Sequence, residues 1–163
     1  MIGSSELLLT MGALIIFGLY AMQANRSMVT ADTWSIENET QLEAAKIAES
    51  IIHQAAALPF DREVVDGPLP QNDPTGLTLL TDFGLPNTEK DVRPNAIVFD
   101  HFHGAQFTES GIFGEYSIEA DVQYVNTDGS VALERTLRKR LEVTVRNQNL
   151  NSPVVMRFTK SYH

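Results

Sequence analysis

The feature that most constrains this sequence is a run of 18 residues, Leu7 to Ala24, that contains no charged side chain. As an α-helix the run would be roughly 27 Å long, and the hydrocarbon core of a bilayer is roughly 30 Å thick. Because apolar residues occupy every side of such a helix, it needs lipid or other apolar helices around it. The run therefore predicts a helix that spans a membrane or packs in the centre of an assembly.

Two other interpretations of the run remain open. A cleaved signal peptide would have basic residues before the run and a small-x-small cleavage site after it. The only charged side chain before the run is Glu6, and Ala21 with Gln23 and Ala24 gives only a weak cleavage site. A buried helix of a soluble protein is the second alternative, but an all-round apolar helix needs a large protein to cover it.

Glu6 lies at the edge of this apolar run. A charged side chain costs about 2.5–3.5 kcal/mol at the centre of a membrane helix and less near the interface. One interpretation is a carboxylate that contacts lipid headgroups. The other is a carboxylate that pairs with a cation during assembly, and residues 1–25 contain no lysine or arginine. The amine of the chain's own N-terminus, or that of a neighbouring copy, is then the expected partner.

Residues 37–58 predict an amphipathic helix that continues the first one. Its apolar residues recur every three or four positions, which gives one face for a core. The members of this face are Leu42, Ala45, Ala48, Ile52 and Ala55, widened by Ile47, Ile51 and Leu58. Pro59 disfavours continuation of the helix, so the helix is expected to end before it. The less regular segment Thr30–Trp34 is the expected position of any kink.

The rest of the chain divides into a connecting region and a sheet. Residues 59–95 contain six of the seven prolines and predict a long connection with one strand or helical turn at most. Residues 96–163 predict strands, beginning with the apolar run Ala96–Phe99 and ending with the alternating residues Val154–Tyr162.

A hairpin is predicted in the middle of this sheet. Tyr116–Tyr124 and Val131–Val145 alternate apolar and polar residues on either side of the turn signal Asn126–Gly129. Arg135 and Lys139 interrupt the second pattern, which indicates a bulge or two side chains that extend from a sheet edge. We expect an antiparallel sheet whose apolar face packs on the amphipathic helix, an α+β fold. The helix residues expected against the sheet are Leu42, Ile47, Ala48, Ile52 and Ala55.

This order of elements resembles the type IV pilins and pseudopilins. The carboxylate before the apolar run, the helix that continues into a head and the C-terminal sheet carry the resemblance, and the segment Ala44–Asp61 is similar to the helix of minor pilins and secretion pseudopilins. The resemblance implies a pilin-like fold with a transmembrane or filament-core helix at residues 1–29 and a globular head at residues 30–163.

The resemblance also implies a function. The chain is expected to be a structural subunit of an extracellular helical filament, held in the inner (cytoplasmic) membrane before assembly. A minor pilin, a type II secretion pseudopilin and a monomeric membrane-anchored binding domain are the alternatives. The implied partners are copies of the chain, an inner-membrane assembly machinery and a prepilin peptidase acting near Gly3 and Ser4. The residues expected to mediate assembly are Glu6, Leu7, Leu8, Leu14, Ile15, Phe17, Gly18 and Leu19.

Composition and the absence of certain motifs argue against several other classes of function. The formal net charge of −9 disfavours nucleic-acid binding, and the absence of cysteine excludes thiolate metal sites and thiol catalysis. His101 and His103, expected on one face of a strand, could begin a zinc or copper site with Asp100 or Glu109 as further ligands. No third histidine is near them in sequence, so no metal is expected. The basic cluster Arg138–Arg140 predicts a solvated strand or an intersubunit ion-pair patch. No phosphate loop or nucleophile motif occurs, so neither an enzyme nor a cofactor is expected.

Overall fold

The structure is a computed structural model that describes residues 3–65, 67, 73–85 and 92–162. The chain forms two compact units, Met1–Glu39 and Thr40–His163. The first element, helix α1, spans Ser4–Ala57 and so contributes residues to both units. Residues 1 and 2 of the predicted filament-core helix and several residues of the proline-rich connection lie outside the described residues.

The first unit consists of the N-terminal part of α1. Residues 30–34, where a kink was expected, are all helical. The hydroxyl groups of Thr30 and Thr33 donate to the carbonyl oxygens of Arg26 (2.9 Å) and Val29 (2.8 Å), one turn earlier. These polar side chains are therefore satisfied by the helix itself.

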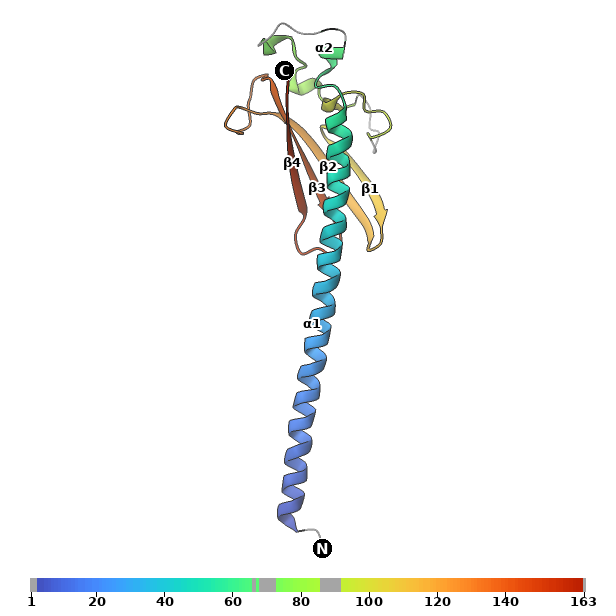
Figure 1. Ribbon diagram of the computed structural model, residues 1–163, viewed down its shortest axis with the longest axis vertical. Coiled ribbons are helices and arrows are strands. Elements are labelled where there is room, and N and C mark those ends of the chain that lie inside the picture. Colours follow the sequence, from blue (N-terminus) through green and yellow to red (C-terminus); the bar gives the residue numbers. More distant parts are fainter. Residues whose placement is uncertain (1–2, 66, 68–72, 86–91, 163) are drawn as a thin grey trace. The chain divides into compact units, whose positions relative to one another are not determined.

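The second unit contains the remaining part of α1 and a four-stranded antiparallel sheet (Figure 1). The strands follow one another in sequence order, and their bounds are β1 Ala105–Gly111, β2 Gly114–Tyr124, β3 Arg138–Arg146 and β4 Val154–Ser161. The architecture is α+β and pilin-like, as the sequence predicts. The sheet begins at Ala105, however, and not at Ala96.

The predicted hairpin is confirmed as an antiparallel pair of β2 and β3. The register runs from Ser117 opposite Arg146 to Tyr124 opposite Lys139 without a bulge. The second strand begins at Arg138 and not at Val131, because Val125 and Val131 form only an isolated bridge. Residues beyond the bridge leave the ladder, and their polar groups find other partners. Among these, the Arg135 guanidinium donates to the carbonyl oxygen of Leu77 (3.0 Å), and Leu133 is 97% exposed.

The core of the second unit lies between α1 and one face of the sheet. The helix residues buried there are Thr40, Ala44, Ile47, Ala48, Ile51, Ile52 and Ala55. Leu42 was expected in this face, but it is 59% exposed, and Ala45 is only partly buried. The buried stripe runs through the fully buried Ala44, Ala48 and Ala55, whose small side chains allow close contact with the sheet. The sheet contributes β2 residues from Tyr116 to Val122 and β3 residues from Leu141 to Val145.

The connection between α1 and the sheet is built from short helical turns. These are α2 (Arg62–Val65) and the 3₁₀ turns η1 (Pro74–Gly76), η2 (Leu80–Asp82) and η3 (Phe99–Phe102). The expected strand at Ala96–Phe99 is wrong, because Phe99 and Phe102 bury the same side of a 3₁₀ turn at a spacing of three residues. The Phe99 N–H donates to the Pro59 carbonyl oxygen (2.9 Å), which joins this turn to the end of α1.

The end of α1 is also joined to the last strand. The Lys160 ammonium on β4 donates to the carbonyl oxygens of Ala56 (2.7 Å) and Leu58. A cation at the C-terminal end of a helix satisfies carbonyl groups that lack helical partners and interacts favourably with the helix dipole. Burial lowers the pKa of Lys160.

Candidate assembly segment and buried charge cluster

The apolar segment of α1 is the candidate site that the sequence identifies. It is the one described helix that is long and apolar enough to cross a membrane. Its most apolar 18-residue window has a mean hydropathy of 1.9, and none of that window is buried within the chain. The segment therefore presents apolar side chains that the described part of the chain does not cover.

The predicted assembly residues all lie in this part of α1. The exposed large side chains are Leu7, Leu8, Leu14, Ile15, Phe17 and Leu19, and Gly18 lies between the last two. A Cβ atom added to Gly18 would meet no atom within 4 Å, so its side of the helix is open. These residues cover more than one stripe of the helix, and the exposed Leu9, Ile16 and Tyr20 lie on the remaining side, so the segment is apolar all round.

The predicted processing residues lie where α1 begins. Gly3 precedes the helix, and its carbonyl oxygen accepts from the N–H groups of Glu6 (3.0 Å) and Leu7 (3.3 Å). Ser4 is the first helical residue. Glu6 is in the first turn, where a carboxylate interacts favourably with the helix dipole. No side-chain partner of Glu6 lies among the described residues, so a partner from another molecule is compatible with this geometry.

The two histidines do not share one site. Residues 99–102 form η3 and not a strand, so the expected arrangement of His101 and His103 on one strand face is wrong. Arg62 lies 3.2 Å from the His101 ring, and burial followed by this positive charge lowers the pKa of His101. His103 lies 2.8 Å from Asp121, whose hydrogen bond raises the pKa of His103. Across the described residues, no group of three or more histidine, aspartate or glutamate side chains could hold a metal ion.

The basic cluster at the start of β3 is divided by the strand geometry. Successive side chains of a strand point to opposite faces. Arg138 and Arg140 donate to the carbonyl oxygens of Thr127 (3.4 Å) and Gly129 (2.9 Å) in the preceding connection. Lys139 points the other way and is completely buried. The expectation that Lys139 extends from a sheet edge is wrong, and of the three basic residues only Arg138 and Arg140 share a face of the strand.

Lys139 is instead the centre of a charge cluster that sequence reasoning missed. Its ammonium lies 2.5 Å from a carboxylate oxygen of Asp61 and 2.5 Å from one of Asp100. It also donates to the carbonyl oxygen of Phe60 (3.1 Å). Lys139, Leu141 and Val143 are alternate residues of β3, so their side chains lie on the same face of the strand. This alternation is the one feature of the sequence that indicates an inward position for Lys139. The two aspartates are 78 and 39 residues away from it in sequence, so no local pattern joins them.

Aromatic rings enclose this cluster. The Lys139 nitrogen lies 4.5 Å from the ring centroid of Phe60, 4.8 Å from that of Phe83 and 5.1 Å from that of Tyr124. A cation over an aromatic face is attracted by the ring quadrupole, and the rings also exclude water. The cluster is therefore both charged and dry, which is a costly environment for any unpaired group.

The two carboxyl groups have different surroundings. Asp61 accepts from the Thr78 hydroxyl (2.6 Å), the Thr78 N–H (3.1 Å) and the Glu63 N–H (3.0 Å). Burial acts to raise the pKa of Asp61, but Lys139 and these donors outweigh it and lower that pKa. Asp100 has an Oδ2 atom with no hydrogen-bond partner in the structure described. Burial, opposed by Lys139 and reinforced by Asp61, raises the pKa of Asp100 to about 6.

A second polar contact, made by Glu43, joins the start of the buried part of α1 to the sheet. Glu43 accepts from the Ile112 N–H (3.0 Å) and the Tyr116 hydroxyl (2.7 Å), at the turn that joins β1 and β2. The Ile112 bond and then the Tyr116 bond lower the pKa of Glu43. Gly111 is required beside them, because a Cβ atom there would lie 2.6 Å from a Glu43 oxygen.

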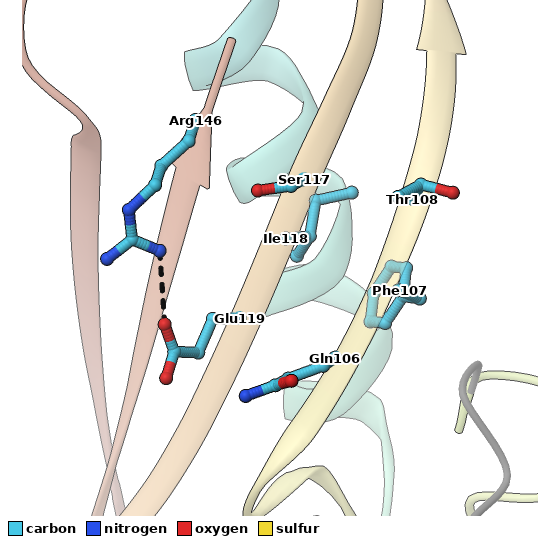
Figure 2. Close-up of a pocket in the computed structure, with 7 residues that line it drawn as sticks. All are labelled: Gln106, Phe107, Thr108, Ser117, Ile118, Glu119 and Arg146. Atoms are coloured by element: carbon cyan, nitrogen blue, oxygen red, sulfur yellow. Dashed lines mark hydrogen bonds and ion pairs between the residues drawn. The ribbon is translucent and has the colours of Figure 1, made fainter.

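The outer face of the sheet carries a hollow (Figure 2). It is lined by Gln106, Phe107 and Thr108 of β1, by Ser117, Ile118 and Glu119 of β2, and by Arg146 of β3. Arg146 and Glu119 form an ion pair at 3.1 Å that is about half exposed. A solvated ion pair of this kind contributes little to stability.

No protein-family model matches this chain, and no curated protein or solved structure is significantly similar to it. The function is therefore argued from the residues and geometry described above.

Proposed function

We propose that this chain is a structural subunit of an extracellular helical filament of the type IV pilus kind, assembled through the apolar segment of α1. The observation that carries the proposal is that residues 7–24 are apolar on all sides and exposed. Such a helix is stable in lipid or against copies of itself. In this proposal the inner membrane holds the subunit first, and the filament core holds it afterwards.

Glu6 supplies the register between subunits in this proposal. A lone carboxylate among packed apolar helices is destabilising unless a cation pairs with it. Since residues 1–25 contain no lysine or arginine, the free amine of a neighbouring mature subunit is the cation available at that depth. Pairing of the two groups would satisfy both charges and fix the axial position of one copy against the next.

The charges of the head are suited to head-to-tail contacts. Residues 111–163 carry seven basic and six acidic side chains, whereas residues 59–110 carry three basic and nine acidic ones. A heterologous contact between such surfaces generates a helical array when its rotation does not close into a ring. The assembly machinery and the prepilin peptidase implied by the family resemblance would act on the membrane-held subunit, the peptidase near Gly3 and Ser4.

The test compares filament yield with membrane level in cells that express the chain. Glu6→Leu is expected to insert as well as the wild type and to abolish filaments, and Glu6→Asp is expected to give an intermediate yield. Immunoblots of sheared surface material and of membranes measure both quantities, and negative-stain microscopy identifies the fibres. Glu49→Leu, an exposed glutamate in the same helix, is the matched control.

Three outcomes would contradict the proposal. Normal filaments from Glu6→Leu at normal subunit levels would show that Glu6 has no register role. Detergent-dependent monomers with no fibres from the wild type would favour a membrane-anchored binding domain. A few copies of this chain within fibres made mostly of another protein would favour a minor pilin or secretion pseudopilin.

A further inference from the structure

The cluster of Lys139, Asp61 and Asp100 holds an amine and two carboxyl groups in contact inside a dry core. We propose that Lys139 and Asp100 condense to form an intramolecular amide crosslink between β3 and η3, with Asp61 as the carboxylate that transfers protons. This is a modification site made by the chain itself, and it does not depend on the proposed filament function.

The distances bring the reacting atoms within reach. The Lys139 nitrogen is 2.5 Å from Oδ1 of Asp100. The carboxyl carbon lies at most one C–O bond, about 1.2 Å, farther away. Reacting atoms about 3–3.5 Å apart in a fixed geometry are positioned for attack, which replaces a bimolecular step by an intramolecular one. All three side chains are at least 97% buried, so this geometry is held by the core.

The different surroundings of the aspartates assign their roles. Asp61 has three hydrogen-bond donors other than Lys139 within 3.1 Å, and its lowered pKa keeps it ionised as a base. Asp100 has an unpartnered oxygen among the described residues and a pKa raised to about 6 by burial. A protonated carboxyl group is a better electrophile than a carboxylate. The amine is therefore expected to attack Asp100 and to give its protons to Asp61.

The condensation balances without any other reactant. Asp61 takes a proton from the Lys139 ammonium, and the free amine attacks the carboxyl carbon of protonated Asp100. Asp61 gives that proton to the departing hydroxyl of Asp100 and takes a second proton from the nitrogen. One C–N bond forms, one C–O bond breaks, one water molecule leaves, and one proton remains on Asp61.

The product suits this site better than the reactants do. An ammonium and a carboxyl group in a water-poor core are replaced by a neutral amide, which removes buried charge. The new amide N–H remains close to the carbonyl oxygen of Phe60, which already accepts from this nitrogen at 3.1 Å. Phe60, Phe83 and Tyr124 surround the bond and oppose its hydrolysis by excluding water. Because the chain has no cysteine, it cannot form a disulfide, and this amide would give it a covalent crosslink.

The decisive experiment is an intact-mass measurement on the full chain under denaturing conditions, with its N-terminus determined. The expected mass is lower than that of the linear polypeptide by one water molecule. Tandem mass spectrometry of a digest is expected to place the link between Lys139 and Asp100. The full linear mass would overturn the proposal, and so would a water loss located anywhere else, including a Lys139–Asp61 link.

Variants test the role of each group. Asp61→Ala retains both reacting groups but removes the base, so the water loss should disappear completely in a variant that remains folded by circular dichroism. Lys139→Met and Asp100→Ala should lose it as well. Lys160→Met, which alters a lysine that donates to carbonyl oxygens only, is the control and should retain the crosslink. A folded Asp61→Ala protein with the full crosslink would overturn the role of Asp61. The wild-type mass decides the proposal even if these variants fail to fold.

Discussion

Helix α1 contains two regions with different apolar patterns and opposite environments. Residues 7–24 are exposed, have no charged side chain and show apolar residues on every side. Residues 40–57 bury one stripe against the sheet and place Lys46, Glu49 and His53 outside it. The comparison shows that a helix with its apolar residues on one face can be covered by its own chain, whereas a helix that is apolar all round needs apolar surroundings on every side.

The largest expected effect lies in the buried region. Ile51 is 1% exposed, and Ile51→Ala should lower the free energy of unfolding of the head by about 2–5 kcal/mol because it leaves a cavity. Denaturant titration of the detergent-solubilised chain measures this. Leu14→Ala removes a similar volume from the exposed region and should leave that free energy unchanged. Equal losses from the two variants would refute the contrast between the regions.

The next effect concerns insertion of the exposed region. Leu14→Lys places a charge in the middle of the apolar segment at a cost of about 2.5–3.5 kcal/mol, so the membrane-inserted fraction should fall. Alkaline extraction of membranes followed by immunoblotting measures that fraction. His53→Lys, on the exposed side of residues 40–57, should insert normally. Equal insertion of both variants would mean that the segment is not membrane-embedded.

A smaller effect is expected from the tyrosines of the two regions. Tyr116→Phe removes the hydroxyl that donates to Glu43 at 2.7 Å and should cost about 1.5 kcal/mol of head stability, the lower end of the range for a bond to a charged group. Tyr20→Phe, in the exposed segment, should cost nothing by the same thermal or denaturant measurement. An unchanged stability in Tyr116→Phe would show that other hydrogen bonds to Glu43 compensate for the lost one.

The smallest effect is a pH dependence confined to the head. The hydrogen bond between His103 and Asp121 raises the pKa of the histidine and lowers that of the aspartate. The contribution of His103 is therefore complete below its unfolded pKa of about 6.5 and is lost as pH rises through its higher folded pKa. The contribution of Asp121 is complete above about pH 4 and is lost as pH falls through its lower folded pKa.

The pair is partly exposed, so its contribution should be under about 1 kcal/mol. Unfolding curves of the wild type and of His103→Gln should differ most between about pH 4 and 6.5. A difference that persists unchanged at pH 9 would contradict the ion pair. Insertion of residues 7–24, which contain no acidic, basic or histidine side chain, should not vary over this range.

The elements that the sequence predicts correctly are those with strong periodicity. The helix to residue 57, the pairing of β2 with β3 and the last strand follow from apolar spacing and a turn signal. The errors occur where tertiary contacts override the local pattern. Phe99 and Phe102 form a 3₁₀ turn because both are buried at a spacing of three, and Leu42 is exposed because the buried stripe passes through Ala44.

The buried charge cluster could not be found from local patterns. Lys139 occupies a core position of β3. In the sequence, a lysine at that position interrupts the apolar alternation, because the two aspartates that contact it are distant along the chain. Asp61 follows α1, and Asp100 lies in a turn that the sequence reads as a strand. The contact of these two aspartates with Lys139 depends on the path of the proline-rich connection. Short turns and long-range contacts in that connection produce no periodic pattern in the sequence.

The contact of Lys160 with the end of α1 has a consequence for the order of folding during synthesis. The ribosome produces the helix first, and the ammonium that caps its last carbonyl groups lies 104 residues beyond Ala56. Until β4 has been made, the helix end lacks this partner, while the sheet can grow through pairs of neighbouring strands that close early. Completion of the head therefore waits for the synthesis of its final strand.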